Sequence, residues 1–348
     1  MSQTKPKILI TGATGYIGGT VLETLLTSSD SSLRNLSLSV AVRSNAHSPH
    51  FTSRGITVHP LTSLDDTTTL RTLASQHDIV LHLASGFHPT AAQALIHGLA
   101  DRKTGSAADV TFIHLTGCSN IGDRPLSLGL VDKRVHSDRD DVLSLLRERE
   151  KVWSYAQRKI DIVVTETGAE KGVRTYIVML PLIFGFGTGV ARLNRMLYGL
   201  AADDVKRGVA GYIGDGQGTW GVIDVRDAAE LFACLVGKVV RREYPDSGEK
   251  GWFFGCLAEM RYEEWAAKNG EAGLRAGVLK RREPKSVSLE EQAADSGWPV
   301  EMAEALATNA RIRSERWEEL GWEPKRGVSG WDESWTEMMV EVFKDCMQ

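Results

Sequence analysis

The chain has 348 residues, a length that suits one large domain or two modest ones. Hydrophobic residues make up 42% and charged residues 25%, which excludes a wholly disordered chain and leaves enough apolar material for a buried core. The net charge of −4 gives no overall attraction for nucleic acid or for an anionic membrane, so we expect neither as a partner.

The cysteines and the N-terminal residues narrow the class further. No paired Cys/His spacing occurs among Cys118, Cys234, Cys256 and Cys346, so we expect neither a disulfide framework nor a metal site. The first seven residues lack the apolar stretch of a signal peptide, and no apolar run approaches the roughly 18 residues that span a membrane. We therefore expect a cytoplasmic protein with reduced thiols.

Short apolar strands alternate with helices through the first half of the chain. The predicted strands are residues 7–11, 36–42, 56–60, 78–84, 110–116 and 175–180. Apolar residues at helical spacing predict helices over residues 20–26, 90–100 and 138–159. Because strands that alternate with helices form right-handed βαβ units, the predicted fold class is α/β, a Rossmann-type doubly wound parallel sheet.

The composition of the sequence changes after about residue 185. Glycines recur at short intervals over residues 185–221, and eight of the nine tryptophans lie at or beyond Trp220. Tryptophan suits the walls of a cleft, which favours an apolar ligand. We predict a first domain over residues 1–185 and a smaller, mostly C-terminal substrate-binding lobe over residues 186–348. A helix predicted at 224–240 has one apolar face, so we expect residues 222–240 to return to the first domain.

A glycine-rich segment joins the first strand to the first helix. Its sequence is Thr11-Gly12-Ala13-Thr14-Gly15-Tyr16-Ile17-Gly18. The first glycine allows a tight turn, the second lets a pyrophosphate approach the backbone, and the third lets helix and strand pack closely. The helix N-terminus then offers free N–H groups to the anion. This strand–turn–helix context predicts that residues 1–185 form an NAD(P)-binding domain.

The end of the second predicted strand bears on which dinucleotide binds. An acidic residue there would hold the ribose 2′-hydroxyl of NAD, but this chain has Arg43 and Ser44 and no carboxylate. The planar guanidinium of Arg43 suits a 2′-phosphate, to which Ser44 can also donate. We therefore expect NADP(H) in preference to NAD(H); the alternative is that Arg43 is a solvated surface residue.

The sequence resembles the extended or atypical short-chain dehydrogenase/reductase superfamily, especially its NmrA-like and dihydroflavonol-reductase-like groups. The resemblance covers essentially the whole chain, through the glycine signature and residues 82–85 (HLAS), 113–123 (IHLTGCSNIGD), 179–189 (MLPLIFGFGTG) and 314–324 (SERWEELGWEP). It implies a role in secondary metabolism. It also implies that the cofactor lies near Ala84 and Ser85, and its nicotinamide near Pro181, Leu182 and Ile183.

In that superfamily a tyrosine donates a proton to a carbonyl, a lysine four residues later lowers the tyrosine pKa, and a serine or threonine orients the oxygen. Tyr155 and Lys159 have this spacing, which predicts both side chains on one face of a helix. The superfamily's serine aligns at or beside Gly117, where Thr116 and Ser119 are the nearest hydroxyls, and we prefer Thr116. The alternative is a packed tyrosine with a solvated lysine.

For four further polar residues the sequence predicts a structural role and not a functional one. His82 and His114 lie in buried strands, so we expect satisfied core residues and not ligands. Asp224 and Asp227 lie at the start of the helix predicted at 224–240, where either can cap it.

Three functional hypotheses follow. The favoured one is an NADPH-dependent oxidoreductase that reduces a carbonyl of a small, apolar metabolite. The second is a non-catalytic, NmrA-like NADP(H) sensor that binds a protein partner. The third is an NAD-dependent epimerase, against which Arg43 argues. For the favoured hypothesis we expect a small-molecule substrate as partner and a monomer or homodimer.

Overall fold

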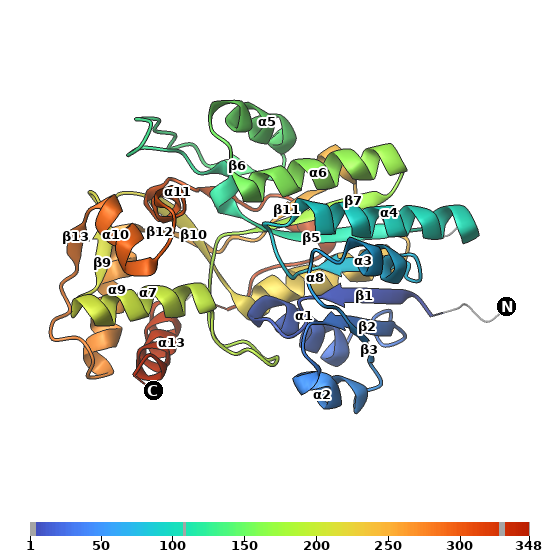
Figure 1. Ribbon diagram of the computed structural model, residues 1–348, viewed down its shortest axis with the longest axis horizontal. Helices are drawn as coiled ribbons and strands as arrows, with labels where there is room; N and C mark the ends of the chain where they lie inside the picture. Colours follow the sequence, from blue (N-terminus) through green and yellow to red (C-terminus); the bar gives the residue numbers. More distant parts are fainter. Residues whose placement is uncertain (1–4, 107–108, 327–330, 348) are drawn as a thin grey trace.

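A computed structural model describes residues 5–106, 109–326 and 331–347 (Figure 1). Its centre is a parallel sheet of seven strands, which confirms the predicted α/β Rossmann class. The strands are β1 (Lys7–Thr11), β2 (Ser37–Val42), β3 (Thr57–Pro60), β4 (Ile79–His82), β5 (Thr111–Gly117), β7 (Arg174–Leu180) and β11 (Trp252–Phe254). They lie in the order β11-β7-β5-β4-β1-β2-β3.

Helices cover both faces of this sheet, so alternate residues of each strand are buried on opposite sides. One face packs against α1 (Tyr16–Thr27), α2 (Ser48–Thr52) and α8 (Val225–Val240). The other packs against α3 (Thr67–Ala74), α4 (Pro89–Ser106), α5 (Val142–Val152) and α6 (Ala156–Lys171). In β1, Ile8 and Ile10 belong to the first core and Leu9 to the second. Burial on both sides explains why the strands read as nearly continuous apolar runs.

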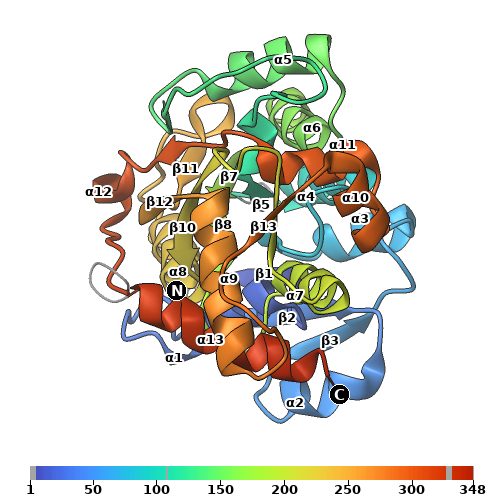
Figure 2. The ribbon, with the colours of Figure 1, turned by 90° about the vertical axis from the view of Figure 1, so that its left-hand side faces the viewer.

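A smaller lobe stands at the carboxyl edge of the sheet (Figures 1 and 2). Its strands are β8 (Leu182–Phe184), β9 (Gly211–Ile213), β10 (Thr219–Asp224), β12 (Ala258–Arg261) and β13 (Lys285–Val287). Its helices are α7 (Arg195–Arg207), α9 (Tyr262–Arg275), α10 (Leu289–Ser296), α11 (Val300–Glu304) and α13 (Trp331–Asp345). Two short strands, β6 (His136–Ser137) and β14 (Ile312–Arg313), pair with each other, and α12 (Trp317–Leu320) packs near α8.

The tryptophans of the C-terminal half largely build the cores. Trp335 is fully buried and its ring meets that of Trp265 edge to face, with centroids 6.0 Å apart. Trp252 and Trp322 are also buried, in the cores on the two faces of the main sheet. The enrichment in tryptophan therefore reflects packing at these four positions and is not by itself a sign of a ligand cleft.

The helix predicted over residues 138–159 is wrong, because the chain forms two helices there. Asp141 caps α5, its carboxylate accepting from the N–H of Ser144. Trp153 and Tyr155 then adopt extended backbone angles, which separate α5 from α6. Gly172, with φ at +63°, ends α6.

Strand β11 was not predicted, and neither were α2 and α3. Residues 252–254 fall within the segment predicted as the smaller lobe, but they pair with Ile177, Val178 and Met179 of β7 and so extend the main sheet. The chain thus crosses to the smaller lobe and returns to the sheet more than once.

Helix α8 packs against α1, on the first domain, whereas residues 222–224, predicted to return with it, belong to β10, which pairs with β8 and β12. Asp224 caps α8, because its carboxylate accepts from the N–H of Arg226 at 2.8 Å, and this confirms one of the two predicted caps. Asp227 has another role: its carboxylate accepts from the backbone N–H groups of Lys325 and Arg326. Across the described residues, no helix combines the length and apolar character that crossing a bilayer requires.

Candidate active site

The glycine loop turns tightly between β1 and α1 at the carboxyl edge of the sheet. Gly12 has φ at +82°, and a Cβ there would lie 2.5 Å from the carbonyl oxygen of Leu83. The N–H of Gly15 donates to the carbonyl of Gly12 at 2.9 Å. Only glycine fits position 12, because both the backbone angle and the space exclude a side chain.

The start of α1 is open to a ligand. Gly15 is the N-cap residue, and no side chain caps the helix. Apart from its chain neighbours, a Cβ on Gly15 would find only the Gly12 carbonyl oxygen within 4 Å, at 3.1 Å. A Cβ on Gly18, by contrast, would collide with that oxygen. The loop therefore fits the pyrophosphate of a dinucleotide, with free N–H groups of α1 facing the anion.

Arg43 and Ser44 follow β2, the neighbour of β1 in the sheet. Both are exposed, and the hydroxyl of Ser44 accepts from the N–H of Ala46 at 3.2 Å. The structure shows no ion pair between Arg43 and any other described residue. The guanidinium is thus available to an anion, as the predicted contact with a 2′-phosphate requires.

The other predicted cofactor residues are exposed or half-buried after β4 and buried around β8. Ala84 and Ser85 follow β4, and a Cβ on Gly12 would lie 2.7 Å from the Ala84 nitrogen. Pro181 joins β7 to β8, whose residues Leu182 and Ile183 are 1% and 7% exposed. The side chain of Leu182 belongs to the core of the smaller lobe, so the structure does not present it to a cleft.

Tyr16 links the glycine loop to the smaller lobe. Its hydroxyl donates to the carbonyl oxygen of Gly185, just after β8, at 2.7 Å. Next to it, Gly189 approaches Gly19 of α1 so closely that a Cβ on Gly189 would lie 2.5 Å from the Gly19 Cα. The segment after β8 is therefore fixed against the start of α1.

Tyr155 lies at the N-cap of α6 and is 9% exposed. Its hydroxyl donates to Oγ of Ser119 at 3.1 Å. Ser119 lies in the 3-10 turn Cys118–Ile121, directly after β5. A phenol and a hydroxyl thus meet at the carboxyl edge of β5, the same edge as the glycine loop.

Tyr155 and Lys159 lie one helical turn apart at the start of α6. Tyr155 is the N-cap residue, with extended backbone angles, and its carbonyl oxygen accepts from the Lys159 N–H at 3.1 Å. The Lys159 side chain is 53% exposed, and its Nζ lies 3.8 Å from a carboxylate oxygen of Glu150. The predicted action of Lys159 on the phenol stays a prediction.

Two arginines, not predicted, contact the Tyr155 ring. The guanidinium carbons of Arg124 and Arg158 lie 5.5 and 5.8 Å from the ring centroid. Burial raises the pKa of the Tyr155 phenol above its ordinary value, while the hydrogen bond with Ser119 and these two positive charges oppose the rise.

Thr116, the hydroxyl we preferred, has other partners. Its Oγ1 donates to the carboxylate of Asp161 at 2.9 Å and accepts from Nδ2 of Asn120 at 2.9 Å. The structure therefore pairs the phenol of Tyr155 with Ser119 and holds Thr116 in a buried network beneath it.

Gln157 is a site residue that the sequence analysis missed. Its Oε1 accepts from Oγ of Ser119 at 2.6 Å. Its side chain covers Gly86 and Gly117, where an added Cβ would lie 3.0 and 2.9 Å from Nε2. The available signal was a pair of polar residues four apart, Gln157 and Asp161, which the structure places on the face of α6 toward the sheet.

The network below this site is buried, and burial shifts the pKa values of its ionisable groups against their charged forms. Burial raises the pKa of Asp161 far above the ordinary carboxyl value, against the effect of its hydrogen bonds with Thr116 and Asn120. His114 stacks on His82, and burial lowers the pKa of His82 to about 4. No group of His, Cys, Asp and Glu among the described residues is arranged to hold a metal ion.

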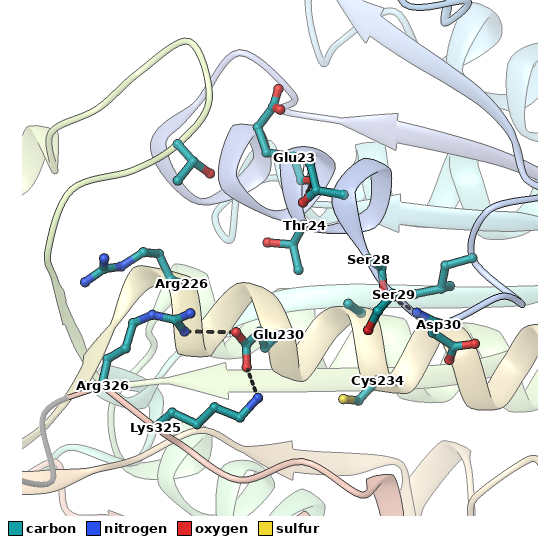
Figure 3. Close-up of a pocket in the computed structure, with 14 residues that line it drawn as sticks. Glu23, Thr24, Ser28, Ser29, Asp30, Arg226, Glu230, Cys234, Lys325 and Arg326 are labelled. Carbon is teal, nitrogen blue, oxygen red and sulfur yellow. Dashed lines mark hydrogen bonds and ion pairs between the residues drawn. The ribbon is translucent and has the colours of Figure 1, made fainter.

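A cavity of about 610 Å³ lies elsewhere, between α1 and α8 (Figure 3). No predicted catalytic or cofactor residue lines it. The lysine and arginines that line it are paired with acids: Lys325 and Arg326 with Glu230 of α8, and Arg226 with Asp224 at the end of β10. Since these charges are neutralised, the described residues that line the cavity offer no unpaired cation to an anion.

Comparison with known proteins agrees with this architecture. Residues 8–246 match the model of the NAD dependent epimerase/dehydratase family. The chain is 27% identical over 304 residues to an oxidase, ucsJ, of an Acremonium species, covering 82% of this chain and 84% of that protein. An uncharacterised protein of Schizosaccharomyces pombe is 27% identical over 234 residues, covering 67% of this chain and 71% of that protein.

Two solved structures share the fold. One is the dTDP-glucose 4,6-dehydratase DesIV of Streptomyces venezuelae with NAD bound, at 14% identity and a TM-score of 0.66, covering 96% of this chain and 97% of that chain. The other is the UDP-glucose 4-epimerase of Thermotoga maritima with UDP-glucose, at 16% identity and a TM-score of 0.61, covering 98% of this chain and 100% of that chain.

Proposed function

Because the chain belongs to the NAD-dependent epimerase/dehydratase family of extended short-chain dehydrogenases/reductases, we propose that it is an NADPH-dependent oxidoreductase that reduces the carbonyl of a small, apolar metabolite. The observation that carries the proposal is the hydrogen bond between Tyr155 and Ser119 at the edge of the sheet that bears the glycine loop. A phenol that touches a second hydroxyl there can serve as a proton donor to a carbonyl oxygen.

Each residue then has a definite task. The glycine loop and the N-terminus of α1 hold the dinucleotide, which supplies the hydride when bound. Tyr155 transfers its hydroxyl proton to the carbonyl oxygen, so that the carbonyl group becomes an alcohol. Ser119 positions the phenol by accepting its hydrogen bond, and Gln157 fixes Ser119 by accepting the hydrogen bond of the Ser119 hydroxyl. Thr116 and Asp161 support the turn from below.

The substitution Tyr155→Phe tests the proton donor, because it removes one buried oxygen. We expect turnover to fall by about 10²- to 10⁴-fold, the usual contribution of general acid catalysis, while NADPH affinity stays unchanged. The assay follows NADPH oxidation with a panel of apolar aldehydes and ketones. The matched control is Tyr176→Phe, which removes a hydroxyl bonded to the Pro245 carbonyl and should leave turnover intact. Full turnover by Tyr155→Phe would exclude Tyr155 as the donor.

The preference for NADPH is tested by calorimetric titration of the cofactor-free protein with NADPH and, separately, NADH. We expect NADPH to bind at least tenfold more tightly, about 1.4 kcal/mol, because Arg43 has no competing partner among the described residues. The variant Arg43→Ala should lose this preference, and Arg281→Ala, at an exposed arginine elsewhere, should keep it. A preference for NADH would contradict the role of Arg43 and favour the NAD-dependent epimerase.

One observation favours a second candidate, an NADP(H) sensor without turnover that binds a protein partner. Tyr155 is only 9% exposed, and Lys159 Nζ lies 3.8 Å from Glu150. A sensor binds NADPH, turns over no substrate in its unaltered form, and binds its partner differently with NADP⁺ and NADPH. Cytoplasmic location, secondary metabolism and a monomeric or homodimeric state stay predictions.

A further inference from the structure

Residues 123–131, here called the strap, connect the Tyr155 site to the smaller lobe. The strap follows the turn that carries Ser119, and paired backbone hydrogen bonds between Arg124 and Leu130, at 3.1 and 3.0 Å, close it into a loop. In Figure 1 the chain after β5 runs from the main sheet toward α11. The strap is thus the segment through which the smaller lobe can act on the phenol.

Two acidic side chains fix the strap to the smaller lobe. Glu304, 1% exposed at the end of α11, accepts from the N–H groups of Leu126 and Ser127 at 3.1 and 2.8 Å and from the Ser127 hydroxyl at 2.6 Å. At the start of the strap, Asp123 accepts from the backbone N–H and the side-chain amide of Asn309, at 2.8 and 2.7 Å. Hydrogen bonds to charged acceptors are stronger than neutral ones, so the strap has a fixed position.

The strap places one buried cation, the Arg124 guanidinium, near the Tyr155 ring. Arg124 is 5% exposed, and its guanidinium carbon lies 5.5 Å from the Tyr155 ring centroid. Its NH1 donates to the carbonyl oxygen of Glu301 at 2.8 Å and lies 3.5 Å from the Glu304 carboxylate. Both contacts come from α11, so the smaller lobe determines where this charge sits.

The other charged or titratable groups around Tyr155 come from its own helix and its neighbours. Arg158 of α6 contacts the ring at 5.8 Å and is paired with Glu150 of α5 at 3.2 Å. Glu150 also accepts the Tyr155 backbone N–H and lies near Lys159. Cys118, in the turn after β5, has a slight effect in the opposite direction to the arginines. Arg124 is therefore the cation near the phenol that the smaller lobe holds.

We propose that Arg124 is a positioning residue that does the work predicted for Lys159: it holds and polarises the Tyr155 phenol, and α11 holds Arg124. This inference rests on the proposed function, because polarising the phenol serves a purpose only if Tyr155 donates a proton. The positive charge favours the phenolate over the neutral phenol, so it makes the hydroxyl a better proton donor. The smaller lobe thereby contributes to the proton donor without touching it.

The test measures the ionisation of Tyr155 itself. Protein labelled with ¹³C at the tyrosine Cζ is titrated with alkali by NMR, over the range in which circular dichroism shows the fold intact. The Tyr155 signal is assigned by its loss in Tyr155→Phe. We expect Arg124→Gln to raise the Tyr155 pKa by about one unit, the lower end of the effect of a neighbouring opposite charge. Lys159→Gln, the matched control, should leave it unchanged.

The outcomes separate this inference from the proposed function. A shift in Lys159→Gln as large as that in Arg124→Gln, or no shift in Arg124→Gln, overturns the role of Arg124. If Arg124→Gln does not fold, the variants Arg124→Lys and Lys159→Gln are titrated in its place. If Arg124 has the proposed role, the Tyr155 pKa of each variant stays within a few tenths of a unit of the value in the unaltered protein. A larger rise of the Tyr155 pKa in either variant overturns the role. The titration needs no substrate, whereas full turnover by Tyr155→Phe rejects the proposed function alone.

Discussion

The glycine loop and the Tyr155 site lie at one edge of the same sheet, but they are built differently. The loop is made of backbone atoms from eight consecutive residues, and its shape depends on the missing Cβ atoms of Gly12 and Gly18. The Tyr155 site is made of side chains from α6, the turn after β5 and the strap, which α11 holds. Local sequence can specify the first kind of site, whereas the second exists only when the whole chain has folded.

The largest effect is expected where the loop has no space. Gly12→Ala places a Cβ 2.5 Å from the Leu83 oxygen at a positive φ, so we expect a loss of about 2–5 kcal/mol in the free energy of unfolding and of nucleotide binding. Gly55→Ala is the control for backbone strain, because Gly55 has φ at +72° with nothing within 4 Å; it should lose about 1–2 kcal/mol. Urea denaturation and calorimetry measure both. Equal losses would mean that the contact with Leu83 is unimportant.

The Tyr155 site is probed by exchanging its two candidate hydroxyls. Ser119→Ala removes the oxygen bonded to the phenol, so we expect turnover to fall about 10- to 100-fold with little change in stability. Thr116→Ala leaves the buried Asp161 without one donor, so it should cost about 1–3 kcal/mol of stability and spare turnover. Steady-state kinetics and urea denaturation distinguish them. The reverse pattern would restore Thr116 as the hydroxyl of the site.

The smallest effect concerns pH. Because burial raises the pKa of Asp161 in the folded protein, its favourable contribution is complete below the ordinary carboxyl pKa of about 4 and is lost as pH rises through the raised value. The free energy of unfolding should therefore fall less steeply with pH in Asp161→Asn than in the unaltered protein. Asp204, whose pKa burial raises to about 7, contributes equally to both curves. Parallel curves would show that Asp161 is charged in the folded protein.

The sequence correctly predicts those parts of the molecule whose structure depends on residues close together in the chain. The apolar run 7–11 coincides with β1, and the glycine loop follows it as expected. No local pattern marks the break before α6, where Tyr155 bonds to Ser119, 36 residues away. None marks the place of Arg124 either, because its partners lie on α11, more than 170 residues away. No local pattern encodes such contacts.

Strand β11 has a consequence for how the protein is made. It is the last strand to join the main sheet, and it covers the outer edge of β7, whose backbone is otherwise unpaired. A ribosome that has released only residues 1–185 has produced a chain with that edge open and without α8 to cover one face of the sheet. Open edges pair readily with other chains, so such a nascent or truncated product would aggregate. The sheet gains its seventh strand only after residue 254 has emerged.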